Sequence, residues 1–136
     1  MVIIALVSII LLVLSGISKA IKDTVQDHFY NSIFRKLNPA FWEKGGSWLN
    51  KYKDPASGDM TPKFWGSTTF LAWTTDAWHL FDTLQSTFWQ LAVTIPFVYL
   101  MGWHWWLGIP VLILIKACVS LPFEVAYSKL FVRNEA

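Results

Sequence analysis

Two side chains with complementary chemistry, Asp76 and His79, stand three residues apart in the segment AWTTDAWHLF. On a helix this spacing projects both side chains from one face, as in the carboxylate–histidine ligand pairs of helical metal sites. A carboxylate that orients an imidazole can also serve as a general acid–base pair. The spacing therefore predicts a metal site or an acid–base site, and a purely structural hydrogen-bonded pair is the third interpretation.

Two further carboxylates, Asp82 and Glu124, extend this candidate site. Pairing antiparallel positions outward from a predicted return at residues 102–106 places Glu124 at the depth of His79 and Asp82. Mixed carboxylate and imidazole ligands suit a divalent transition metal such as iron, manganese or zinc. The catalytic candidates are therefore Asp76, His79 and Glu124. Asp82 joins them as a candidate metal ligand.

The segment that carries most of these residues, residues 66–101, is too apolar for a soluble helix and too polar for an ordinary lipid-facing span. Placed at about 100° per residue, eight of its polar side chains fall within a sector of roughly 100°: Thr69, Asp76, His79, Thr83, Ser86, Thr87, Gln90 and Thr94. A lysine in the next apolar run falls at the same depth as the inner part of this edge. We call this set the polar stripe: Thr83, Ser86, Gln90, Thr94 and Lys116. Because unsatisfied polar atoms cost several kcal/mol in hydrocarbon, protein, water or a bound group must cover the stripe.

Three apolar runs predict an all-α integral membrane protein with three transmembrane helices, at about residues 2–18, 70–101 and 106–128. A cleaved signal peptide is the alternative for the first run. However, no basic residue precedes this run and no clear small-x-small cleavage site follows it, so we expect a retained first span. A chain of 136 residues suffices for one domain, and residues 1–136 are interpreted as a single membrane domain.

The chain between the first two spans is predicted to stay near the membrane surface. Apolar residues at four-residue spacing indicate an amphipathic helix over residues 19–37, which extends the first span into the cytoplasm without a break. Residues 38–65 carry turn signals such as Gly45-Gly46 and interleave aromatic side chains with lysines. This composition is typical of an interfacial loop at headgroup depth. An aromatic lid over a lipid site is the alternative.

Basic residues are concentrated between the first and second spans, which hold eight of the 11 Lys and Arg side chains: Lys19, Lys22, Arg35, Lys36, Lys44, Lys51, Lys53 and Lys63. The positive-inside rule therefore places this segment and the C-terminus in the cytoplasm and the N-terminus outside, as in a bacterial-type inner membrane. A net charge of +2 in a chain that is 54% hydrophobic argues against a nucleic-acid partner. The single cysteine, Cys118, excludes an internal disulfide.

Three classes of function are open. We expect foremost a structural or accessory subunit of a membrane assembly, which contacts membrane lipids and packs as a homo-oligomer or against partner membrane subunits through the polar stripe. The alternative is a membrane-embedded enzyme whose carboxylate and histidine site acts on a lipid or lipid-linked substrate at the cytoplasmic interface. Its cofactor is unknown, with a divalent transition metal as the candidate. A proton or ion pathway along the polar stripe is the third hypothesis.

Overall fold

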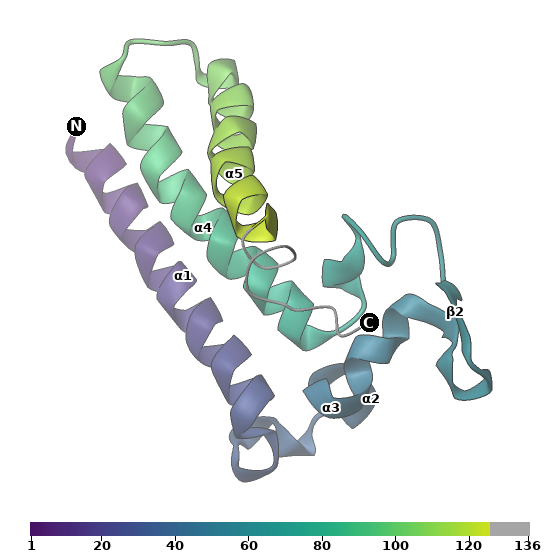
Figure 1. Ribbon diagram of the computed structural model, residues 1–136. Coiled ribbons are helices and arrows are strands. Elements are labelled where there is room, and N and C mark those ends of the chain that lie inside the picture. Colours follow the sequence, from purple (N-terminus) through teal and green to yellow (C-terminus); the bar gives the residue numbers. More distant parts are fainter. Residues whose placement is uncertain (126–136) are drawn as a thin grey trace. The chain divides into compact units, whose positions relative to one another are not determined.

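The computed structural model describes residues 1–125, with the side chains of residues 121 and 123–125 outside that description. The described chain is mostly helical, which agrees with the predicted all-α class (Figure 1). It divides into two compact units. Residues 12–88 form the first, here called the central unit. Residues 1–11 and the chain from Trp89 onward form the second, here called the terminal unit.

The first helix, α1 (Val2–Asp27), confirms that the apolar N-terminal run continues into the amphipathic segment without a break. By length and mean hydropathy, it is the one described helix that meets the usual criteria for a membrane span. The helix ends at Asp27, so the predicted extension to residue 37 is wrong. Beyond it, the Ser32 hydroxyl donates to the Phe29 carbonyl and accepts from the Phe34 amide. Such local side-chain hydrogen bonds favour turns over a continuing helix.

The predicted loop at residues 38–65 contains a series of short elements. Asn38 begins the series by accepting a hydrogen bond from the Ala40 amide, and Glu43 caps the next turn in the same way through Gly45 and Gly46. The elements are α2 (Pro39–Trp42), α3 (Lys44–Ser47), a 3-10 turn (Trp48–Lys51), β1 (Tyr52–Asp54), a second 3-10 turn (Pro55–Ser57) and β2 (Asp59–Pro62). The two strands pair antiparallel as a hairpin. This hairpin was not predicted from the sequence.

The long polar-edged helix, α4 (Ala77–Leu100), begins at Ala77 rather than at the predicted residue 70. The preceding residues form a loop and a 3-10 turn (Ala72–Thr74) instead. Gly66 has a φ of +83°, a conformation that interrupts a helix, and the hydroxyls of Thr74 and Thr75 donate to the carbonyls three residues before them. Thr69 had the spacing of the polar helix face, but it lies in a turn and its hydroxyl donates to the Gly66 carbonyl.

The last described helix, α5 (Gly108–Val125), follows a turn at Gly102 and a 3-10 turn (Trp105–Leu107). Within it and the preceding turn, residues Trp105–Ser120 form an apolar helix shorter than a usual span. Residues 126–128 of the predicted third span lie outside the described residues.

In both units, the kinds of side chain that are buried and exposed are the reverse of those in a water-soluble protein. The buried polar side chains are Ser15, Ser18, Ser47, Ser67, Thr75, Asp76, Gln90 and Thr94, while the buried apolar ones are Val25, Phe29, Ala77, Ala92 and Val98. Large apolar side chains on the long helices are exposed instead, including Ile10 at 58% and Ile113 at 64%. In a water-soluble protein the large aliphatic side chains fill the interior. Here small and polar side chains take that place.

Candidate functional site

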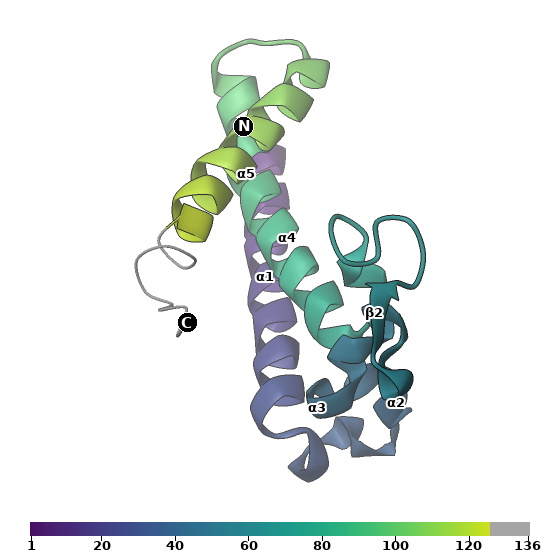
Figure 2. The ribbon, with the colours of Figure 1, turned by 45° about the vertical axis from the view of Figure 1, so that its right-hand side comes forward.

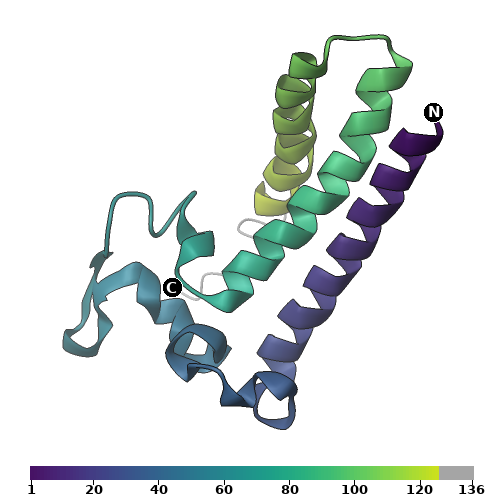
Figure 3. The same cartoon turned by 180° about the vertical axis from the view of Figure 1, so that it is seen from behind.

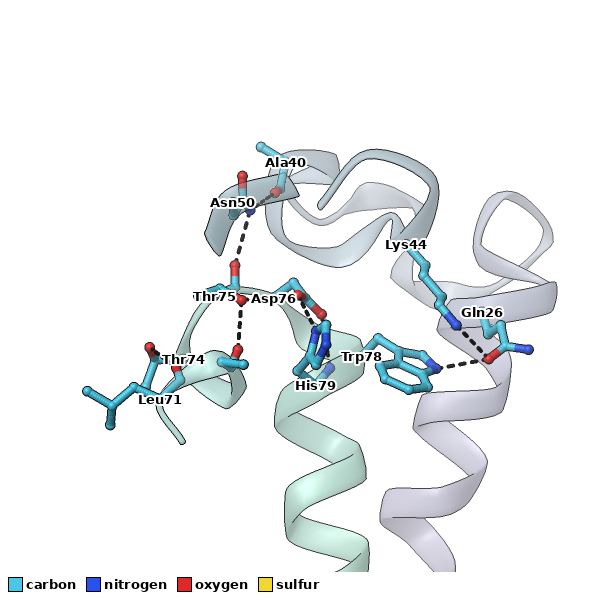
Figure 4. A network of polar contacts seen from close by, with 11 residues as sticks. Gln26, Ala40, Lys44, Asn50, Leu71, Thr74, Thr75, Asp76, Trp78 and His79 are labelled. Carbon is cyan, nitrogen blue, oxygen red and sulfur yellow. Dashed lines mark hydrogen bonds and ion pairs between the residues drawn. The ribbon is translucent and has the colours of Figure 1, made fainter. Parts of the chain in front are cut away.

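The site lies within the central unit at the start of α4 and contains the Asp76–His79 pair predicted from the sequence. Asp76 directly precedes the helix, and its Oδ1 accepts a hydrogen bond from the backbone amide of His79 at 2.9 Å. Its Oδ2 lies 2.6 Å from Nδ1 of the His79 ring and accepts a further bond from the Thr75 hydroxyl at 3.2 Å (Figure 4). The side chain of Asp76 is 1% exposed and that of His79 is 25% exposed.

The position of Asp76 explains why the helix begins there. A carboxylate just before the first helical residue accepts from an amide that has no partner within the helix, and its charge is favourable at the positive end of the helix dipole. Both carboxylate oxygens are thereby hydrogen-bonded inside the chain. The same side chain starts α4 and holds the His79 ring.

Burial and hydrogen bonding act on the pKa of Asp76 in opposite directions. Burial is the largest single influence and raises it, because the charged form loses hydration. The hydrogen bonds from the His79 ring and amide, the charge of His79 and the bond from Thr75 together outweigh burial, and the pKa lies below its ordinary value. The carboxylate is therefore ionised at neutral pH. A neutral His79 then donates through Nδ1 and keeps Nε2 as an acceptor.

Asp82, the third candidate on α4, is not brought to this pair. Its Oδ1 lies 2.9 Å from Nζ of Lys22 on α1, in an ion pair whose lysine side chain is 17% exposed. Among the described residues, no three His, Cys, Asp or Glu side chains are grouped as metal ligands. Asp76, His79 and Asp82 thus form no three-residue ligand group by themselves, and the site predicted with Glu124 stays a prediction. Glu124 lies in the last turn of α5, and its side chain is outside the described part of the chain.

A second contact network, which the sequence analysis missed, lies next to His79. Trp78 Nε1 and Lys44 Nζ both donate to Gln26 Oε1, each at 2.9 Å, so one amide oxygen joins α1, α3 and α4. The Lys44 ammonium stands 3.9 Å from the centroid of the Trp78 ring, in a cation–π contact. Partial burial lowers the pKa of Lys44, although nearby carboxylates act in the opposite direction.

Asn50 connects the short-helix segment to the same end of α4. Its amide nitrogen donates to the Ala40 carbonyl and, at 3.1 Å, to the Thr75 carbonyl (Figure 4). A polar hollow of about 260 Å³ opens beside these groups, with Asn38, Asn50 and Thr75 in its lining. His79 is not among the residues that line it. Asn50 therefore holds the backbone of Thr75, whose hydroxyl donates to Asp76.

The polar stripe is divided by the structure into covered and exposed parts. Gln90 and Thr94 are 6% and 3% exposed, and the Thr94 hydroxyl donates to the Gln90 carbonyl at 2.8 Å. Ser86 donates to the Thr83 carbonyl at 3.0 Å, and both side chains are half-buried. Hydroxyls that bond to their own helix need no other partner in an apolar medium. Lys116 is different, because its side chain is exposed on α5.

The arrangement can hold α1, α3 and α4 together at one end of the central unit, and it presents one oriented imidazole nitrogen. No sequence pattern joins Gln26 to Trp78, which are 52 residues apart, so local spacing could not have found their contact.

Comparison with known proteins gives no match to a protein-family model, to a curated protein or to a solved structure, and the function must be argued from the side chains themselves.

Proposed function

We propose that this chain is a small polytopic membrane protein and acts as a structural or accessory subunit of a membrane assembly. The observation that supports this proposal most is the reversed burial, with polar and small side chains inside and large aliphatic ones outside. In a bilayer, lipid tails solvate aliphatic side chains, while small and polar residues pack between helices. The proposed spans are most of α1, α4 and α5.

Within the central unit, the second half of α1 lies beside the first turns of α4 (Figure 3). Ser15 and Ser18 are buried on one face of α1, and the Ser15 hydroxyl donates to the Gln85 carbonyl of α4 at 2.9 Å. Val13 and Ile17 of the same helix are 55% and 51% exposed. Such small polar contacts with apolar outer faces are characteristic of helix pairs within membranes. A helix at the core of a water-soluble protein would bury these aliphatic side chains.

The assembly part of the proposal is supported by Lys116. Its side chain is exposed on α5, in a row of apolar residues where Leu114 is 62% and Val119 is 54% exposed. A lysine in the middle of an apolar helix is costly in hydrocarbon unless a protein group, water or a headgroup receives its charge. A carboxylate or carbonyl of a neighbouring subunit would satisfy it. Lys116 would then fix the register of the contact between subunits.

Native mass spectrometry of the protein released from lipid nanodiscs would test this function. We expect a species of defined stoichiometry that is heavier than the monomer, and we expect Lys116→Ala to shift it toward the monomer. The matched control is Lys53→Ala, which removes an exposed lysine from the β1 strand and should leave the stoichiometry unchanged. A monomer at all protein-to-lipid ratios, with and without the substitution, would contradict a homo-oligomeric assembly. If Lys116→Ala also leaves co-purification with other membrane proteins unchanged, the subunit function is contradicted.

The Asp76–His79 pair favours a second candidate, an enzyme acting on a lipid-linked substrate at the membrane interface. The specific observation is the short contact that orients the ring, which leaves Nε2 of a neutral His79 able to take a proton. In the first candidate the pair only stabilises the start of α4. Two variants separate the candidates: His79→Asn keeps a donor near Asp76, and His79→Phe removes it. If activity on a lipid-linked substrate is found and both variants abolish it while remaining folded, the enzyme candidate replaces the first.

A further inference from the structure

The loop between β2 and α4 carries four exposed aromatic side chains. We call residues 64–73 the aromatic loop. Phe64 is 42% exposed, Trp65 81%, Phe70 58% and Trp73 40%. The rings of Trp65 and Phe70 pack edge to face, with centroids 4.9 Å apart. Clustered aromatic rings on an exposed loop mark a surface that contacts another protein or a membrane.

The backbone of the aromatic loop satisfies much of its hydrogen bonding within the loop itself. The amides of Ser67, Leu71 and Thr74 donate to loop carbonyls at 2.9 to 3.0 Å. The hydroxyls of Thr69 and Thr74 donate to loop carbonyls as well. Lipid-exposed irregular backbone does not occur in the hydrocarbon core, so the backbone of such a loop belongs at headgroup depth, where water and headgroups reach its polar groups. These turns therefore suit a compact loop at the bilayer interface.

The loop is held at its base by a hydrogen bond and runs in the same direction as the start of α4. The Ser67 hydroxyl, which is fully buried, donates to the Lys51 carbonyl at 2.7 Å. Within the central unit, the loop turns back in the direction in which the first turns of α4 run (Figure 2). Where α4 enters a bilayer, the loop would meet the same surface. The exposed Lys63 precedes it, and a lysine at this depth pairs with lipid phosphates while the rings lie below them.

We infer that the aromatic loop lies in the bilayer interface beside α4, with its backbone at headgroup depth and the Trp65 and Phe70 rings inserted below the phosphate level. The inference rests on the proposed membrane location of α4 and deepens it. The occupant of this surface is lipid rather than protein, because the exposed rings adjoin a lysine that complements lipid phosphate and come just before the proposed span α4. The chain thus contacts the bilayer through a non-helical segment as well as through its helices.

Site-directed spin labelling of the full chain in liposomes tests the inference. Cys118 is replaced by Ser, so that a nitroxide can be attached at one new cysteine: Trp65→Cys or Phe70→Cys in the loop, Met60→Cys on β2, or Ile10→Cys on α1. Met60 is the matched control, since it is apolar and 45% exposed, while Ile10 is 58% exposed on the proposed first span. The measurement compares collision of the label with oxygen, which enters lipid, and with a nickel chelate, which stays in water.

We expect the ratio of oxygen to nickel collisions at both loop positions to be several-fold higher than at position 60 and to approach that at position 10. A lipid-like position 10 with both loop positions resembling position 60 would overturn the inference and leave the proposed function standing. A water-like position 10 would overturn the proposed membrane location as well. Low collision with both reagents and an immobilised label at the loop would show that protein covers it, which would also overturn the inference.

Discussion

The buried carboxylate of Asp76 receives both the backbone amide and the ring Nδ1 of His79, so that one side chain starts α4 and orients a histidine. Replacing Asp76 with Ala removes the cap and leaves these donors without a partner. We expect this variant to lose about 1–3 kcal/mol of unfolding free energy. Reversible unfolding in mixed micelles measures the change.

The control for this substitution is Asp27→Ala, at the exposed C-terminal end of α1. A negative charge there opposes the helix dipole, so its removal should change stability by less than about 0.5 kcal/mol. Equal losses in the Asp76 and Asp27 variants would contradict the capping role of Asp76.

The lowered pKa of Asp76 predicts how stability depends on pH. A carboxyl group whose pKa is lower in the folded chain stabilises the fold at all pH values above its ordinary pKa of 3.8. This contribution is lost as the pH falls from 3.8 through the lower folded value, because protonation then weakens the bonds from His79. Unfolding titrations across this acidic range should show a steeper loss for the natural chain than for Asp76→Asn. Parallel curves would contradict the assignment.

Packing between α1 and α4 predicts that a buried serine tolerates enlargement less than an exposed valine. Ser15 is 8% exposed and donates to Gln85, so Ser15→Leu overfills the contact and should cost about 1–3 kcal/mol. Val13→Leu adds a methylene on the exposed face of the same helix and should change stability by less than about 0.5 kcal/mol. The same micelle unfolding assay compares the two. A larger loss at Val13 would mean that the apolar face, not the serine face, is packed.

The turn at Gly66 predicts sensitivity to a single methyl group. Its φ is +83°, and an added Cβ would lie 3.0 Å from two ring carbons of Phe70. Gly66→Ala should therefore cost about 1 kcal/mol or more. Gly16→Ala is the matched control, because Gly16 lies in α1 with open space around it and alanine favours a helix. Differential scanning calorimetry should show a lower Tm only for the Gly66 variant.

The fold was predictable where the sequence pattern is long and uniform. The apolar run of α1 and its continuation to Asp27 follow from composition, and the predicted end of the second helix at residue 101 differs by one residue from Leu100. The start of that helix was not predictable from periodicity. Thr69 continues the helical spacing of the polar edge while its hydroxyl bonds to the Gly66 carbonyl of a turn. Periodicity records where polar residues stand and not whether the backbone between them is helical.

The candidate site was likewise predictable only where its contacts are local in the sequence. The Asp76–His79 contact is local, and a three-residue spacing was enough to predict it. The partner of Asp82 and the contacts of Gln26 depend on which helices lie side by side, information that a single sequence does not carry. Of the side chains predicted at one depth, Asp76 and His79 form a pair and Asp82 has a different partner, while Glu124 lies outside the described side chains.

Whether the chain crosses the bilayer is decided by its intact mass after the membranes are washed with alkaline carbonate. This wash removes peripheral proteins and leaves proteins whose helices cross the bilayer. We expect the chain to stay in the washed membranes and to keep its complete apolar N-terminal helix. Recovery of the chain in the carbonate supernatant, or of a chain that has lost the residues of α1, would contradict this expectation.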